Sequence, residues 1–215
     1  MPRPPFAERL KLAGPAGDLE ALIEIPLGEA APQSVSSFAV VCHPHPLYGG
    51  TLDNKVVWAL ARAFQQLGAA TIRFNFRGVG ASAASYDAGS GETADALAVA
   101  AYGRARWPHS SLWLAGFSFG AVVALRAAAE ARPQRLVAVA PGITTIELGE
   151  ASAPACPWLI VQGDADEVVP AEAVLAWAHK LSPAPELVVL PGASHFFHGR
   201  INELREAVLA FMQRA

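Results

Sequence analysis

Residues 112–123 read LWLAGFSFGAVV and contain a G-x-S-x-G pattern, Gly116-Phe117-Ser118-Phe119-Gly120. The residues before the pattern are apolar, as in a buried strand, and those after it are small and apolar, as in a tightly packed helix. A serine at such a strand–turn–helix junction adopts strained backbone angles, and the flanking glycines let the strand and the helix approach closely. The stretch therefore predicts a sharp turn that presents Ser118 at a helix N-terminus, where developing negative charge is favoured.

A serine alone is a poor nucleophile and needs a base, which in turn needs an orienting acid. His195 follows the last apolar run of the chain, and Asp166 follows the run before it. The carboxyl ends of parallel strands meet at one edge of an open α/β sheet, where ligands bind. The order Ser118, Asp166, His195 therefore predicts a catalytic triad at this edge.

Apolar runs and breaker residues alternate along the whole chain. Residues 9–13 and 19–25 predict two strands around a Gly-Pro turn, hence an antiparallel hairpin. Further strands are expected at residues 36–42, 70–76, 111–116, 136–140, 158–162 and 187–190. Helices are expected at residues 55–67, 93–106, 121–131, 171–181 and 201–214. This alternation predicts an α/β fold with a mostly parallel sheet and helices on both faces.

Composition limits the class of protein. The 215 residues suit one domain spanning 1–215, and 53% hydrophobic residues with 16% charged ones exclude a mainly disordered chain. The formal net charge of −3 makes nucleic acid an unexpected partner.

Two features bear on the compartment. Cys42 and Cys156 are too few for a disulfide framework and fit buried thiols in a reducing environment. The N-terminus lacks the apolar region of a signal peptide. The uncharged stretch 107–125 contains Pro108, several serines and glycines, and is rejected as a membrane span. We therefore expect a cytoplasmic protein without a membrane partner.

Together these motifs resemble the α/β-hydrolase superfamily over nearly the whole chain. The resemblance is carried by the loop Cys42-His-Pro-His-Pro-Leu-Tyr-Gly-Gly, by Asn75-Phe-Arg-Gly-Val-Gly-Ala-Ser, by the Ser118 pattern, and by Gly163-x-x-Asp166-x-x-Val169-Pro170 with His195. The chain looks most like small, capless, bacterial members similar to dienelactone hydrolase with a His-Pro-His-Pro loop. Dienelactone hydrolase uses a cysteine where Ser118 stands, so its lactone activity is not implied.

The resemblance implies a role for each triad residue. Ser118 is the expected nucleophile, His195 the general base and acid, and Asp166 the orienting carboxylate. Asp164 and Glu167 are rival acids, and the Gly-x-x-Asp-x-x-Val-Pro spacing favours Asp166. His198 is a rival base, but His195 directly follows the loop after the last strand.

Two backbone N–H groups are expected to bind the oxyanion. One belongs to Phe119, the residue after the nucleophile. The other comes from residues 43–50, where superfamily members commonly carry His-Gly and this chain carries prolines. Proline has no N–H group, which leaves His45 and Leu47 as candidates, with His45 slightly favoured by its position.

Two other patterns resemble ligand-binding motifs but lack residues that such motifs require. His43 and His45 lack a third residue at metal-ligand spacing, so a stiff loop that shapes the oxyanion site is the preferred interpretation and no metal is expected. Arg77-Gly-Val-Gly lacks the full dinucleotide fingerprint, so no nucleotide cofactor is expected. Arg77 and Ser82 are interpreted as structural residues of this loop.

The sequence thus predicts a serine hydrolase of the carboxylesterase type that needs no cofactor and takes a small-molecule acyl substrate. An amidase or peptidase with the same triad, or an inactive hydrolase fold used for binding, remain alternatives. Haloalkane dehalogenase chemistry is disfavoured because it needs a carboxylate at position 118. Residues 141–157, with at most two helical turns around 143–148, are too short for a cap domain, so small soluble esters are the expected substrates. A homodimer is left open.

Overall fold

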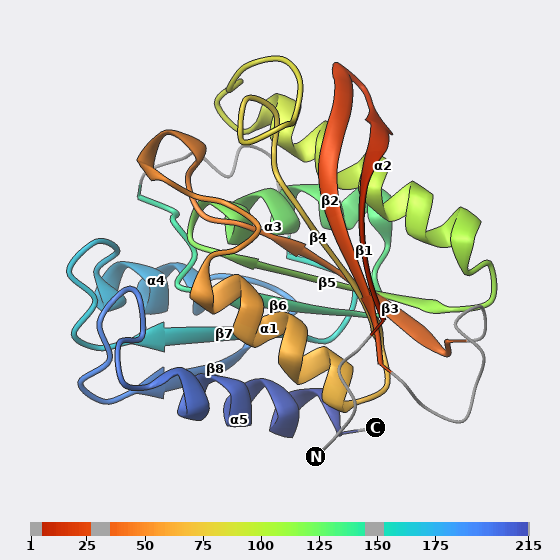
Figure 1. The fold of residues 1–215 in the computed structure, drawn as a ribbon. Helices are drawn as coiled ribbons and strands as arrows, with labels where there is room; N and C mark the ends of the chain where they lie inside the picture. Colours follow the sequence, from red (N-terminus) through yellow and green to blue (C-terminus); the bar gives the residue numbers. More distant parts are fainter. Residues whose placement is uncertain (1–5, 27–34, 145–152, 215) are drawn as a thin grey trace.

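The computed structural model describes residues 6–26, 35–144 and 153–214. Its centre is a twisted eight-stranded sheet with the strand order β1-β2-β4-β3-β5-β6-β7-β8 (Figure 1). The strands are β1 (Phe6–Gly14), β2 (Gly17–Ile25), β3 (Ser37–Cys42), β4 (Ala70–Phe74), β5 (Ser111–Phe117), β6 (Arg135–Val139), β7 (Trp158–Gly163) and β8 (Glu186–Leu190). The pairs β1–β2 and β2–β4 are antiparallel and all other pairs are parallel. The expected mostly parallel sheet with an N-terminal hairpin is confirmed.

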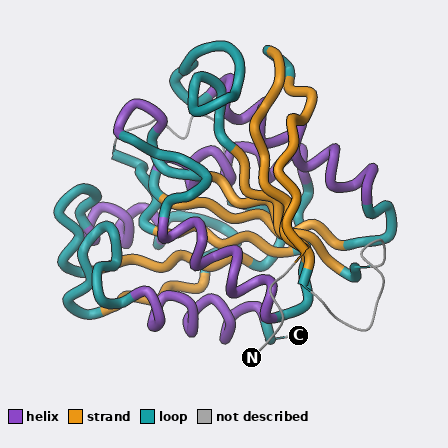
Figure 2. Tube along the Cα trace, in the orientation of Figure 1, coloured by secondary structure: helices purple, strands orange, loops and turns teal. Residues whose placement is uncertain are grey.

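Helices cover both faces of this sheet (Figures 1 and 2). They are α1 (Lys55–Gln66), α2 (Ser90–Arg106), α3 (Phe119–Ala131), α4 (Ala171–Ala178) and α5 (Ile201–Met212). α1 and α5 pack on one face, whereas the buried residues of α2, α3 and α4 join the hydrophobic cluster on the other. The architecture is therefore three layers, with the sheet between two helical layers.

The central strands are apolar on both faces because both faces are covered. All six residues of β3 are buried. Phe38 and Val40 point into the cluster that includes α2 and α3, and Ala39 and Val41 point into the cluster that includes α1 and α5. Continuous apolar runs of this kind are typical of parallel strands buried on both sides.

Element boundaries differ from the prediction at several ends. β4 stops two residues early, and the Phe76 N–H donates to Nε2 of His43 (3.0 Å) outside the ladder. α2 begins three residues early, where the Glu92 carboxylate accepts the Gly89 N–H (2.7 Å). α3 begins two residues early, directly after Ser118, and α4 ends three residues early.

Two predicted features concern the surface and the loops. Within the described residues, no helix is long and apolar enough to cross a membrane, and the uncharged stretch 107–125 divides between β5 and α3.

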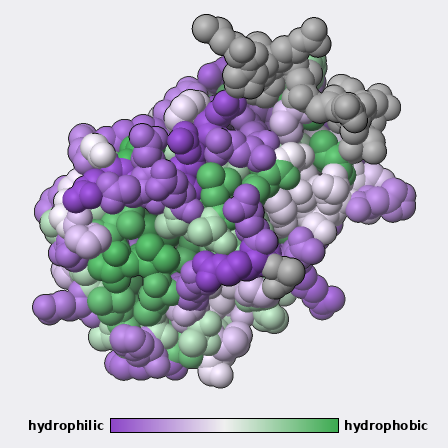
Figure 3. Space-filling view, turned by 90° about the horizontal axis from the view of Figure 1, so that it is seen from below, coloured by the Kyte–Doolittle hydropathy of each residue, from purple (hydrophilic) through white to green (hydrophobic). Residues whose placement is uncertain are grey.

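Seen from the side on which α5 lies, hydrophobic side chains gather in one area of a largely hydrophilic face (Figure 3). The helical turns expected around 143–148 fall largely on residues 145–152, outside the described part of the chain.

Candidate active site

The turn between β5 and α3 holds Ser118 in a strained conformation. Its φ of 55° and ψ of −116° lie in a region that non-glycine residues rarely adopt. The Ser118 N–H donates to the Val139 carbonyl (2.9 Å), and the Ser118 carbonyl accepts the Gly142 N–H (3.1 Å). A Cβ on Gly116 would lie 2.1 Å from the Gly120 carbonyl oxygen, so only glycine fits there. The turn has the close strand–helix approach that the sequence pattern predicts.

The structure brings Ser118, His195 and Asp166 into one hydrogen-bonded chain. Nε2 of His195 lies 3.1 Å from Oγ of Ser118, and Nδ1 of His195 lies 2.8 Å from Oδ2 of Asp166. All three side chains are buried. An ionised Asp166 accepts the Nδ1–H, and this tautomer leaves Nε2 free to accept the serine proton.

Asp166 is placed in surroundings that favour its ionised form. Burial alone would raise the pKa of this carboxyl, but hydrogen bonds from His195 and from the N–H groups of Val169 and Val168 outweigh burial and lower the pKa. Those two N–H groups reach Oδ1 at 2.7 and 2.9 Å. The carboxylate is therefore fixed in orientation while it faces His195.

Gln162 supports the same carboxylate and was missed by the sequence analysis. Its fully buried amide nitrogen donates to Oδ2 of Asp166 (2.9 Å) and to the Val169 carbonyl (3.1 Å). The available signal was a polar residue at the end of the otherwise apolar strand β7, directly before Gly163.

The rival acids have other partners. Oδ1 of Asp164 accepts the Gly192 N–H (2.6 Å), and Oε2 of Glu167 accepts the backbone N–H of His195 (3.1 Å). Both carboxylates therefore brace the loop that follows β8. The contacts to Ser118 and Asp166 are made by His195, and not by His198.

His43 fixes the loop that follows β3. Its Nδ1–H donates to the Pro44 carbonyl (2.6 Å), and its Nε2 accepts the Phe76 N–H (3.0 Å). Burial lowers the pKa of His43 to about 4, against a smaller opposing effect of the Pro44 hydrogen bond. Both ring nitrogens are thus occupied in the neutral form. Among the described residues, no cluster of His, Cys, Asp and Glu could hold a metal ion.

His45 adopts the opposite tautomer. Its Nδ1 accepts the Leu47 N–H (3.2 Å), so its Nε2 carries the proton and donates to the Tyr86 hydroxyl (3.2 Å). The Leu47 N–H is therefore already hydrogen-bonded, and of the two candidates in this loop only His45 has an N–H that this contact leaves available. The His45 ring packs against Phe119 at 4.9 Å between centroids. Phe119 is the first residue of α3, where N–H groups have no partner within the helix.

Comparison with known proteins agrees with this geometry. Residues 40–152 match the model of the alpha/beta hydrolase fold family. XC6422 from Xanthomonas campestris, a serine hydrolase without a lid, is 45% identical, with a TM-score of 0.91 over 99% of this chain and 97% of that one. This chain belongs to the α/β-hydrolase family.

Three further proteins that resemble this hydrolase come from bacteria. A serine hydrolase homologue from Coxiella burnetii is 47% identical, with a TM-score of 0.88 over 94% of this chain and 96% of that one. An uncharacterized protein of Rickettsia prowazekii is 34% identical over 206 residues, which are 91% of this chain and 84% of that one. Dienelactone hydrolase from Anabaena variabilis shares the fold, with 18% identity and a TM-score of 0.76 over 98% of both chains.

A cavity of about 170 Å³ opens beside the Ser118 hydroxyl of this hydrolase. Tyr48, Asn54, Val168 and Phe196 line it together with Ser118 and His195. Its walls come from the loops after β3, β7 and β8, at the carboxyl edge of the sheet. A small molecule can therefore reach the Ser118 hydroxyl from this side.

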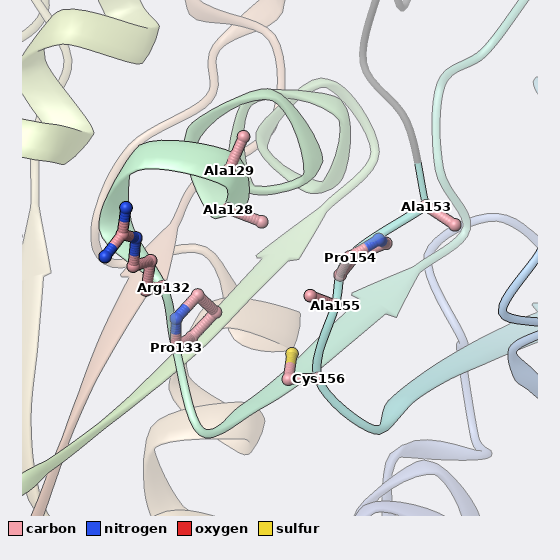
Figure 4. A pocket seen from close by; sticks show the side chains of 8 residues that line it. All are labelled: Ala128, Ala129, Arg132, Pro133, Ala153, Pro154, Ala155 and Cys156. Carbon is pink, nitrogen blue, oxygen red and sulfur yellow. The ribbon is translucent and has the colours of Figure 1, made fainter.

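A larger cavity of about 430 Å³ lies at the opposite end of α3 (Figure 4). Its lining includes Ala128, Arg132, Pro154 and Cys156. Ten residues of α3, about 15 Å of helix, separate its lining residue Ala128 from Ser118. Cys42 and Cys156 are both free thiols, and burial raises the pKa of Cys156. This cavity contains none of the predicted site residues.

Arg77 and Ser82 form part of the supporting structure. Nη2 of Arg77 lies 2.7 Å from Oδ1 of the fully buried Asp95 on α2. The Ser82 hydroxyl donates to the Asn75 carbonyl (2.7 Å) and accepts the Glu20 N–H (2.9 Å). These bonds tie the loop after β4 to α2 and to β2.

Proposed function

We propose that this hydrolase is a serine carboxylesterase that cleaves small esters through an acyl-enzyme on Ser118. The observation that carries the proposal is the hydrogen-bonded chain from Ser118 through His195 to Asp166. In the first step His195 takes the Ser118 proton as Oγ attacks the ester carbonyl, and the imidazolium is stabilised by Asp166. His195 then returns the proton to the departing alcohol. Water, activated by the same imidazole, hydrolyses the acyl-enzyme.

The oxyanion of each tetrahedral intermediate is proposed to bind the N–H groups of Phe119 and His45. The Phe119 N–H lies at the N-terminus of α3, where the helix dipole favours negative charge. The His45 N–H belongs to a loop fixed by the two histidine rings. Leu47 is the weaker candidate because its N–H already donates to His45.

The test is labelling with a fluorophosphonate probe, followed by hydrolysis of p-nitrophenyl esters of increasing acyl length. Wild type should be labelled and should turn over short esters, and Ser118→Ala should lose labelling and about 10⁴–10⁶-fold of kcat. EDTA should leave the rate unchanged, because the proposed mechanism uses no metal. Retained hydrolysis of a few per cent in Ser118→Ala would reject the assignment of the nucleophile.

The matching anilides separate esterase from amidase activity. An esterase should cleave the p-nitrophenyl ester and leave the p-nitroanilide of the same acid essentially intact, whereas an amidase cleaves both.

The single domain and the cytoplasmic location stay predictions.

A further inference from the structure

Large hydrophobic side chains are concentrated around the nucleophile. Leu47, Tyr48, Val168 and Phe196 are exposed, and we call these four residues the apolar rim. Among the described residues only three further large hydrophobic side chains, Phe6, Trp58 and Val189, are as exposed. Exposed apolar side chains that gather at one place on a surface usually mark a binding site.

The rim is assembled from three loops that are far apart in sequence. Leu47 and Tyr48 follow β3, Val168 follows β7, and Phe196 follows β8. Tyr48 is 85% exposed and Leu47 66% exposed, so neither contributes much to the core. Tyr48, Val168 and Phe196 nevertheless line the cavity beside Ser118. Their position is explained by contact with a ligand better than by folding.

The charge of this region selects against anions. The cavity lining includes no Asp, Glu, Lys or Arg side chain among the described residues. Two carboxylates contact the lining residue His195: Asp166 accepts its Nδ1–H and Glu167 accepts its backbone N–H. A substrate with a carboxylate near its ester would lose hydration without gaining a cationic partner. The site is therefore suited to a neutral molecule.

The size of the cavity limits the group that enters it. A volume of about 170 Å³ is large enough to hold one six-membered ring, and a long chain would extend beyond it. Two of the rim side chains are aromatic. Aromatic rings attract one another through stacked or edge-to-face contacts beyond the effect of buried area.

We propose that Tyr48 and Phe196 are specificity-determining residues that bind an aromatic ring next to the scissile carbonyl. The substrate class is then neutral esters of small aromatic carboxylic acids. This inference rests on the proposed esterase function and specifies its substrate. The proposal places the ring on the acyl side, beside Ser118, to which the acyl carbon becomes bonded.

The first experiment compares methyl benzoate with methyl acetate. Wild type should show a KM for methyl benzoate at least about tenfold lower, since one ring in an apolar site contributes this much binding. Tyr48→Ala should raise the KM for methyl benzoate about three- to tenfold more than the KM for methyl acetate. Phe6→Ala is the matched control, because it removes an exposed aromatic side chain from the edge strand β1, outside the cavity. It should change neither KM.

Phe196 needs a milder variant, because its ring lies edge-on to the His195 ring at 5.1 Å. Phe196→Leu keeps an apolar side chain there and should also raise the KM ratio of benzoate to acetate. Methyl 4-carboxybenzoate tests the charge argument. It keeps the ring and the ester, and it should be hydrolysed with kcat/KM at least about tenfold below that of methyl benzoate.

The outcomes distinguish failure of the substrate assignment from failure of the esterase function on which it rests. Hydrolysis of methyl acetate without a lower KM for methyl benzoate, or an equal KM change for both esters in Tyr48→Ala, overturns the aromatic assignment while the esterase function stands. Equal hydrolysis of the 4-carboxy ester overturns the neutral-substrate assignment. Absence of any ester hydrolysis by wild type overturns the esterase function and this inference with it.

Discussion

The Nε2 atom of His43 accepts the backbone N–H of Phe76 at 3.0 Å, which joins the loop after β3 to the loop after β4. The other ring nitrogen donates to the Pro44 carbonyl at 2.6 Å. The ring is fully buried and packs against the Phe76 ring at 4.6 Å between centroids. The hydrogen bond from Phe76 requires neutral imidazole, because a protonated Nε2 cannot accept, whereas the Nδ1–H can donate to Pro44 in either form of the ring.

Stability should therefore depend on pH through His43. The pKa of His43 is lowered to about 4 in the folded protein, against about 6.5 for an unperturbed histidine in the unfolded chain. Below 6.5 the unfolded state binds more protons than the folded state, so the free energy of unfolding falls as pH falls from 6.5 to 4. Above pH 6.5 this contribution is fully present. The total loss is about 3 kcal/mol by linkage.

Urea unfolding from pH 4 to pH 8 measures this effect. His43→Gln keeps an acceptor toward Phe76 but removes the titrating ring. Between pH 6.5 and pH 4 the free energy of unfolding should fall less in the variant than in wild type. The expected difference is about 3 kcal/mol, the contribution of the His43 proton. Parallel curves for the two proteins over this range would contradict a neutral buried His43.

The loop after β3 is also held by close packing against α3. A Cβ on Gly120 would lie 2.4 Å from the carbonyl oxygens of both Cys42 and His43. Alanine normally stabilises a helix by about 1 kcal/mol relative to glycine. In Gly120→Ala the backbone must shift instead, and it would carry the proposed oxyanion donors with it. We expect a destabilised protein with kcat lowered about a hundredfold, as for a displacement of about 1 Å.

A reverse exchange in the same helix controls for helix propensity. Ala129 is exposed near the C-terminal end of α3, so Ala129→Gly should cost about 1 kcal/mol without changing kcat. Unfolding curves and initial rates measure both quantities. A Gly120→Ala protein with unaltered kcat would show that α3 and the loop after β3 can move apart without displacing the proposed oxyanion donors.

The acid of the triad can be distinguished from its neighbour by matched amides. Asp166→Asn should lower kcat about 10⁴-fold, since an amide favours the wrong tautomer of His195 and cannot stabilise its imidazolium. Asp164→Asn should have a small effect, because an amide oxygen can still accept the Gly192 N–H. Both variants are assayed for ester hydrolysis at equal measured stability. A larger loss in Asp164→Asn would reverse the assignment.

The sequence predicted the contacts of Ser118, His195 and Asp166 because each residue follows an apolar strand in a local pattern. The elbow glycines and the strand order place such residues at one edge of the sheet without any knowledge of side-chain packing. The same reasoning predicted the hairpin and the parallel core, since strand periodicity and turn residues are local signals.

Hydrogen bonds whose partners are decided by the folded shape of loops were beyond the reach of the sequence. The amide of Gln162 could be noticed as a polar residue at a strand end, but its partner Asp166 is decided by the turn of the intervening loop. The choice between His45 and Leu47 depended on a ring nitrogen that takes the Leu47 N–H. The early end of β4 likewise depended on His43, a residue 33 positions before Phe76.

We expect the site to be open, without a covering domain. Ser118 lies in a cavity bounded by short loops after β3, β7 and β8, and residues 141–157 are too few for a helical cap. A cavity this small buries little of a long acyl chain. We expect turnover of small esters in solution, with no increase in specific activity when the ester concentration passes its solubility limit. Specific activity is measured against acyl length on both sides of that limit. A sharp rise on crossing it, or a preference for long-chain triglycerides, would reveal a segment that covers the site and moves at an oil–water interface.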